Sequence, residues 1–165
     1  MADTITTQTI ADTSGVKFVV KMTNISDGTG ENLVKKIDAS EVTFMTENAD
    51  RKLAKIWYSI NSANPKSAVE LIWDGATNAT MVILGGNGYW DLRTAGNEIV
   101  NNSTTPTGDV LLSTKNFASG DNYTITSSSS FRVSDHCKED TKVKASDLYS
   151  MALCTITVSY THLTL

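Results

Sequence analysis

The chain has 165 residues, of which 40% are hydrophobic and 19% charged, with 14 basic against 18 acidic residues and a formal net charge of -4. This length fits one globular domain with a sizeable core, and the composition is too apolar for an intrinsically disordered chain. The acidic balance excludes a nucleic-acid binder that relies on bulk positive charge. Ser, Thr and Asn together contribute 52 residues, which favours strands and turns.

The first fifteen residues form a Thr-rich, nearly uncharged segment. Its residues 4–10 alternate between two faces, which is compatible with a strand. Three interpretations stay open for this N-terminal arm, residues 1–15. It is a flexible segment, the first strand of the domain, or a strand that joins the sheet of a neighbouring subunit.

Seven later segments alternate with the period of two that is typical of half-buried strands. They span residues 17–23, 53–61, 68–74, 79–84, 88–93, 109–114 and 121–126. Residues 42–45 form a weaker candidate, and residues 79–84 are apolar on both faces, as in a central strand. No segment has a sustained helical period, although residues 32–40 have room for one helical turn.

Turns rich in Gly, Asn and Asp separate these segments. Gly85-Gly86-Asn87-Gly88 lies between two apolar runs and is the strongest hairpin signal in the chain. Seven or eight short strands with frequent turns predict an all-β fold, an antiparallel β-sandwich of the jelly-roll or immunoglobulin-like kind. We expect this domain to span residues 16–126.

Strand parity assigns the aromatic side chains to faces. Trp73 and Trp90 share a face with apolar neighbours, so we expect both in the core, whereas Trp57 and Tyr89 fall on the polar faces of their strands. An aromatic residue on the outer face of a sheet stacks against a sugar or anchors a protein interface, unless a loop or a second sheet covers it. Trp57 and Tyr89 are therefore the candidate residues for an interface or a glycan contact.

No catalytic constellation stands out in the sequence. Residues 1–126 contain neither His nor Cys, so nucleophilic catalysis of the serine or cysteine type lacks its usual base there. The acidic pairs Asp38 with Glu41, and Glu47 with Asp50, lie in polar stretches where solvated charge is the ordinary role. We therefore expect a protein that is not an enzyme, with no catalytic residue, no cofactor and no metal site.

The chain changes character after residue 126. Both cysteines and both histidines lie beyond this point, at His136, Cys137, Cys154 and His162. Their spacing matches none of the usual zinc-ligand pairs. The last eight residues, 158–165, are identical to one reading frame of a transposon-end adapter used in sequencing libraries. We interpret residues 127–165 as a tail of doubtful origin, frame-shifted or adapter-derived in a metagenomic gene.

Residues 1–126 resemble a family of small proteins from T4-like marine tailed bacteriophages, notably those that infect cyanobacteria. The resemblance rests on KFVVKMTNISDGTGE at 17–31, VKKIDAS at 34–40, YWDL at 89–92 and GDNYTI at 120–125. Members of this family are described as virion structural or hypothetical proteins. The resemblance therefore implies a role class, and it supplies no site residues.

Two hypotheses about function follow. The first, implied by the resemblance, is a non-enzymatic virion structural protein, with capsid decoration favoured, that packs against other virion proteins and against itself. Such a protein is made in the host cytoplasm and resides in the virion, and the sequence shows neither a signal peptide nor an apolar run long enough to span a membrane. We expect neither nucleic acid nor membrane as a partner. The second hypothesis is a carbohydrate-binding β-sandwich, of the tail or fibre adhesin type, that contacts a glycan through Trp57 and Tyr89.

Overall fold

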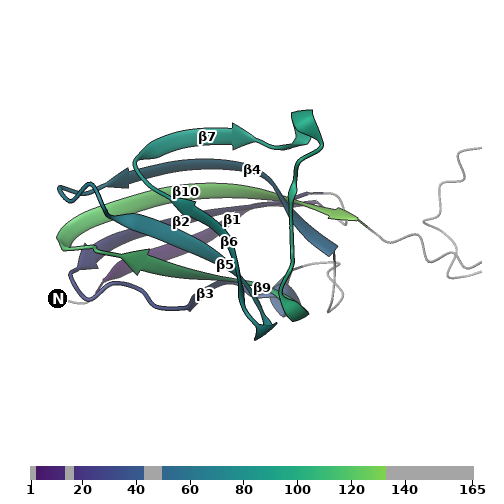
Figure 1. The fold of residues 1–165 in the computed structure, drawn as a ribbon, viewed down its shortest axis with the longest axis horizontal. Helices are drawn as coiled ribbons and strands as arrows, with labels where there is room; N and C mark the ends of the chain where they lie inside the picture. Colours follow the sequence, from purple (N-terminus) through teal and green to yellow (C-terminus); the bar gives the residue numbers. More distant parts are fainter. Residues whose placement is uncertain (1–2, 14–16, 43–49, 133–165) are drawn as a thin grey trace, which may run out of the picture. The chain divides into compact units, whose positions relative to one another are not determined.

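The computed structural model describes residues 3–13, 17–42 and 50–132. The chain separates into a unit of residues 1–134 and a second unit of residues 135–165, and all described residues belong to the first. Their regular structure is almost all β-strand (Figure 1), with two short 3-10 turns, η1 (Ala39–Glu41) and η2 (Arg93–Ala95). Within the described residues, no helix is long and apolar enough to cross a membrane.

The described strands form two antiparallel sheets that pack as a β-sandwich, which confirms the predicted fold class. The larger sheet has the order β1-β2-β10-β4-β7, and β8 pairs with the same edge of β4 as β7. Its strands are β1 (Thr4–Thr13), β2 (Lys17–Asp27), β10 (Ser119–Arg132), β4 (Asp50–Asn61), β7 (Asn87–Asp91) and β8 (Ile99–Val100). The smaller sheet has the order β3-β9-β5-β6, with strands β3 (Val34–Ile37), β9 (Thr104–Lys115), β5 (Ala68–Thr77) and β6 (Ala79–Leu84).

The inner faces of the two sheets enclose one hydrophobic core, and in Figure 1 the strands of the two sheets overlie one another. The larger sheet contributes Met22, Ile56 and Ile125, and the smaller sheet contributes Leu112 and Trp73, all essentially without solvent exposure. Trp73 is thus in the core, as its parity predicted. Alternation along each strand places these apolar side chains inward and polar ones outward.

Six of the seven predicted segments lie within strands, and residues 79–84 coincide with β6. The segment 88–93 overlaps β7 but extends beyond its end at Asp91, to the first residue of η2. The sequence did not reveal β3 and β8, which have four and two residues. Residues 34–37 form β3 instead of the helical turn for which residues 32–40 had room, and only η1 is helical there. Val42 caps η1, while residues 43–45 lie outside the described residues.

The predicted hairpin at residues 85–88 is wrong, because β6 and β7 belong to different sheets. The backbone N–H of Ile60 on β4 donates to the carbonyl of Gly86 at 2.9 Å and to Oδ1 of Asn87 at 3.2 Å. Gly86 has a φ of 66°, a conformation that glycine adopts without strain. The segment therefore carries the chain from the smaller sheet to the edge of the larger sheet.

Both ends of the expected domain belong to the larger sheet. The N-terminal arm forms β1, which pairs with β2 from Thr4 to Thr13. At the other end, β10 continues through Arg132 and pairs with β2 and β4 on either side, so the sheet extends past residue 126. The predicted tail from residue 133 onward, with both cysteines and both histidines, lies outside the described residues.

Candidate functional site

Trp57 and Tyr89 lie next to each other on the outer face of the larger sheet. They are register partners on β4 and β7, their ring centroids are 4.8 Å apart, and the planes differ by 23°. This separation equals the spacing of neighbouring strands, so the two rings stand upright on the sheet, face to face. Trp57 is 42% exposed and Tyr89 47% exposed. The sequence-predicted pair therefore forms one solvent-accessible feature, which we call the aromatic ridge.

A glycine allows the strand that carries Tyr89 to approach β4. Gly88 pairs with Tyr58, and a Cβ at Gly88 would lie 2.4 Å from the Tyr58 hydroxyl oxygen. The Tyr58 ring thus occupies the space that any side chain at position 88 would need. Because this contact lies one residue from Tyr89, it helps to set the register that aligns the two rings of the ridge.

The prediction that Trp90 is a core residue is wrong, because this side chain is 39% exposed. Trp90 pairs with the buried Ile56 and thus has the parity of the inner face. However, β7 is an edge strand and has a sheet neighbour on one side only. The indole makes an edge-to-face contact with Tyr58, at 6.1 Å between centroids and 79° between planes.

Asp91 connects the ridge to two cations. It forms an ion pair with the Lys55 ammonium at 2.7 Å, and two guanidinium N–H groups of Arg93 donate to its two carboxylate oxygens at 3.1 and 3.0 Å. The Tyr89 hydroxyl also donates to Asp91, at 3.2 Å, and the Lys55 ammonium lies 5.9 Å from the centre of the Trp57 ring. Arg93 and then Lys55 hold the pKa of the Asp91 carboxyl well below its usual range. The carboxylate therefore stays ionised and holds the Tyr89 hydroxyl and both cations in place, and Lys55 in turn lies near the Trp57 ring.

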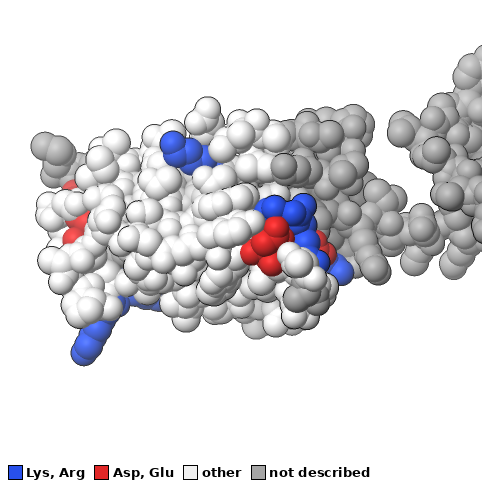
Figure 2. Space-filling model, turned by 90° about the horizontal axis from the view of Figure 1, so that it is seen from above, with Lys and Arg blue, Asp and Glu red and all other residues white. Residues whose placement is uncertain are grey.

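The charged groups form a compact cluster at this end of the sheet. The strands β7 and β4 and the turn η2 lie at the top of Figure 1, and Figure 2 views the molecule from that side. Acidic and basic atoms gather there in one cluster, at the end where η2 lies, while most of the remaining described surface in view is uncharged. The charged groups in this view are thus concentrated in one cluster, with only a few others elsewhere on the surface.

Hydroxyl and amide side chains are the most frequent groups on the rest of the outer face, which also carries Lys21. Strand register places two rows across the larger sheet, read from β7 to β1. One row is Asn87, Ser59, Thr124, Thr23 and Thr6, and the row beside it is Tyr89, Trp57, Thr126, Lys21 and Gln8. These groups donate and accept hydrogen bonds without a strong requirement for one partner geometry.

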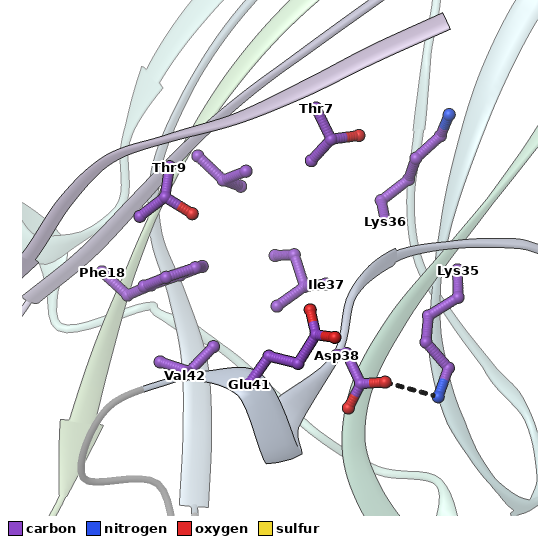
Figure 3. A pocket seen from close by; sticks show the side chains of 10 residues that line it. Thr7, Thr9, Phe18, Lys35, Lys36, Ile37, Asp38, Glu41 and Val42 are labelled. Carbon is purple, nitrogen blue, oxygen red and sulfur yellow. Dashed lines mark hydrogen bonds and ion pairs between the residues drawn. The ribbon is translucent and has the colours of Figure 1, made fainter.

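A cleft of about 500 Å³ opens between β1 and the β3–η1 segment (Figure 3). Thr7 and Thr9 form one wall, Phe18 and Ile37 line the space between, and Glu41 faces them from η1. The cleft has an apolar floor and a hydroxyl-bearing wall. Its lining contains neither His nor Cys among the described residues.

The acidic pair Asp38 and Glu41 lines this cleft but lacks the features of a catalytic acid and base. Asp38 caps η1 by accepting hydrogen bonds from the backbone N–H and the hydroxyl of Ser40, at 3.0 and 2.6 Å. These bonds and the ion pair with Lys35 lower the pKa of Asp38, whereas a general acid requires a raised one. The geometry therefore gives Asp38 a structural role. The other acidic pair of the sequence analysis, Glu47 with Asp50, has no described side chains.

A second cluster of ionisable groups is buried between the sheets. Glu31 forms an ion pair with Lys36 on β3, and both side chains are almost completely buried. Glu31 also accepts hydrogen bonds from the amide of Asn24 at 2.7 Å and from the hydroxyl of Tyr123 at 2.5 Å. Burial, and then Glu31, raises the pKa of the Tyr123 phenol far above its usual value. The cluster connects β3 to β2 and β10. Because its charged groups are buried away from solvent and from any ligand, its role is structural.

The described residues contain no group of three or more His, Cys, Asp or Glu side chains placed to hold a metal ion. The four Cys and His residues weighed for zinc lie outside the described residues. Among the side chains that the structure describes, the aromatic ridge with its ion pairs is therefore the strongest candidate site.

No protein-family model and no curated protein sequence matches the chain. A solved structure of a mutant of a family 29 carbohydrate-binding module is similar over 78% of this chain and 92% of its own, with a TM-score of 0.33 and 6% sequence identity. A similarity this low carries no argument about function.

Proposed function

We propose that this chain is a non-enzymatic β-sandwich that binds a carbohydrate on the outer face of its larger sheet. The observation that carries the proposal is the aromatic ridge. Two rings from neighbouring strands stand upright on a polar face, each more than two-fifths exposed, and are held by a network of ion pairs. A large exposed aromatic pair on a polar surface is typical of a recognition site.

The outer face of the larger sheet has groups that complement those of a sugar. A pyranose ring presents C–H groups on its faces and hydroxyl groups around its rim. The outer faces of Trp57 and Tyr89, which the partner ring does not cover, offer flat apolar surfaces for the C–H groups. The rows of Ser, Thr and Asn beside the ridge offer donors and acceptors for the hydroxyls.

The proposal is tested with a glycan array, followed by titration calorimetry on the glycans that bind. The variant is Trp57→Ala combined with Tyr89→Ala. Ile83→Ala is the matched control, because Ile83 is also a large exposed apolar side chain, 63% exposed, but lies on the smaller sheet. We expect the double variant to keep the thermal unfolding midpoint of the wild type within a few degrees and to lose glycan binding, while the control binds normally.

Two results would contradict the proposal. In one, the array shows no specific glycan for the wild type. In the other, the folded double variant binds the same glycans with unchanged affinity, which would show that the ridge is not the contact surface.

The second candidate is the virion structural role, in which the chain packs against other virion proteins or copies of itself. The observation that favours it is β1, a strand of ten residues at the edge of the larger sheet that pairs with β2. An edge strand leaves one row of backbone groups for pairing with another chain, and the uncharged residues 4–10 do nothing to prevent such pairing. Ile5 and Ile10 on this strand are 42% and 54% exposed.

Mass spectrometry of purified virions from the encoding phage tests the second candidate. Peptides from residues 1–126 are expected at a stoichiometric level in the particle. Their absence from intact virions would exclude a virion role and would leave the carbohydrate proposal unaffected.

A further inference from the structure

The aromatic ridge lies on a cationic surface, although the whole chain is acidic. Lys21, Lys52, Lys55 and Arg93 lie on or beside the outer face of the larger sheet. The acidic side chains described near them are Asp91 and Glu98, of which Glu98 acts electrostatically on Arg93. Cations therefore outnumber anions by four to two around the ridge, in a chain whose net charge is -4.

Two of these cations are held against the ridge. Lys55 and Arg93 share the carboxylate of Asp91, and Glu98 acts electrostatically on Arg93, so the charges of this group balance and the surplus positive charge comes from Lys21 and Lys52. The Arg93 side chain is 55% exposed, which leaves part of its guanidinium accessible to a ligand. Guanidinium groups bind carboxylates and sulfates well because their N–H groups lie in one plane.

Lys21 and Lys52 extend the cationic surface to other sides of the ridge. Lys21 lies in the same cross-strand row as Trp57, with Thr126 between them, which places their backbones about 10 Å apart at the usual strand spacing. Lys52 points outward because its neighbours Arg51 and Leu53 are buried. The described residues supply no ion-pair partner for either lysine. A ligand that stacks on the free face of Trp57 would therefore meet Lys21 next.

The outer face of the smaller sheet differs in this respect. There Lys35 pairs with Asp109 at 2.6 Å and with Asp38 at 3.3 Å, and Lys115 pairs with Glu70 at 3.4 Å. Each lysine of that face has a carboxylate of its own. The surplus of positive charge is thus a property of the face that carries the ridge.

We infer that the glycan bound at the ridge is acidic, a polysaccharide that bears carboxylate or sulfate groups. This inference rests on the proposed carbohydrate-binding function and specifies its ligand class. The rings of Trp57 and Tyr89 stack against the sugar, and Lys21 and Arg93 bind the anionic groups that flank it. A nucleic acid also combines charge with stacking, but the hydroxyl- and amide-rich face and the acidic net charge of the chain favour a sugar polymer.

The test uses pairs of neutral and acidic polymers with the same backbone, namely dextran with dextran sulfate, and hydroxyethyl cellulose with carboxymethyl cellulose. A single-stranded oligo-dT serves as the nucleic-acid arm. Affinity is measured for the wild type, Trp57→Ala, Lys21→Gln and the control Lys66→Gln, an exposed lysine of the loop that links the two sheets. We expect at least one acidic polymer to bind about tenfold more tightly than its neutral partner.

In the expected result, Lys21→Gln reduces this preference and Lys66→Gln does not. Trp57→Ala abolishes binding, and raising the salt from 0.1 M to 1 M, which shortens the Debye length from about 10 Å to about 3 Å, weakens it. Equal binding of neutral and acidic partners, lost in Trp57→Ala, would overturn the acidic ligand and leave the carbohydrate function standing. Binding of acidic polymers that survives Trp57→Ala, or tighter binding of oligo-dT, would overturn the inference. Failure of every acidic polymer to bind would overturn the acidic ligand, whereas the carbohydrate function is overturned only if the glycan array also shows no specific ligand.

Discussion

Replacing Lys36 by Met should destabilise the protein severely, and the same change at the neighbouring Lys35 should not. The Lys36 side chain is 1% exposed and pairs with the almost equally buried Glu31, whereas the Lys35 side chain is 48% exposed and pairs with the partly exposed Asp38 and the buried Asp109. Removing one partner of a buried ion pair costs about 3–5 kcal/mol, because the other charge stays buried without compensation. Losing the ion pairs of Lys35 should cost only about 0–1 kcal/mol, because this lysine is largely solvated and Asp109 keeps its hydrogen bond from the backbone N–H of Ala39.

The two variants provide a matched comparison, because they change adjacent residues of the short strand β3 from the same amino acid to the same amino acid. Urea unfolding followed by tryptophan fluorescence reports the free energy of unfolding, with the buried Trp73 as an internal probe. At about 2–4 °C per kcal/mol for a chain of this size, Lys36→Met should lower the melting temperature by roughly 6–20 °C. Lys35→Met should lower it by less than about 4 °C.

A third variant separates the charge effect from a packing effect. Glu31→Gln combined with Lys36→Met removes both charges, while the Tyr123 hydroxyl and the Asn24 amide can still donate to the new side chain. This double variant should therefore be more stable than Lys36→Met alone. If Lys36→Met and Lys35→Met unfold within 1 kcal/mol of each other, the burial of the Lys36–Glu31 pair does not carry the energy assigned to it.

Three further predictions follow from other contacts. Because the folded protein raises the pKa of Tyr123, the contribution of this phenol to stability should be constant below about pH 10 and should decrease above it by up to about 1.4 kcal/mol per pH unit. Tyr123→Phe should lose this contribution, which urea midpoints of both proteins at about pH 8, 10 and 11 would measure. Gly88→Ala places a methyl group against Tyr58 and should cost about 1–3 kcal/mol. Gly85→Ala, whose methyl group would make only an ordinary contact with the Ser67 carbonyl oxygen at 3.8 Å, should cost less than about 1 kcal/mol in the same assay. A chain ending at Thr126 loses the part of β10 that pairs with the starts of β2 and β4 and should fail to fold, while a chain ending at Ser134 should melt cooperatively by circular dichroism.

Periodicity predicted most of this fold because half-buried strands carry their face assignment in every second residue. Ile56 and Ile60 lie at even positions and Trp57 at an odd one, and this alternation predicted both the strand β4 and the faces on which its side chains lie. The strand β3 escaped detection because its inward positions include Lys36, a charged residue that is buried only because Glu31 lies opposite it. Arg51 is buried in the same way at the start of β4, where the sequence gives no apolar signal.

The candidate site was predictable in its residues but not in its geometry. Parity identified Trp57 and Tyr89 as outward-facing, yet their contact depends on the pairing of β4 with β7. The turn at residues 85–88 has the sequence of a hairpin, and a β6–β7 hairpin would have given Tyr89 different neighbours. Parity also placed Trp90 correctly on the inner face and still gave the wrong burial, because burial on an edge strand depends on the facing sheet.

The net charge of the chain does not predict the charge of each surface, because many acidic side chains are buried, cap a turn or pair with a nearby lysine. Glu31 is buried, Asp38 caps η1, and the buried Asp109 accepts from the backbone N–H of Ala39 and pairs with Lys35. Asp121 is likewise buried and accepts hydrogen bonds from Ser62 and from the backbone N–H of Ala118. These carboxylates stabilise turns and junctions and leave the outer face of the larger sheet to its lysines and Arg93. A chain with a net charge of -4 can therefore present a cationic face beside the aromatic ridge, which is the combination that an acidic polysaccharide requires.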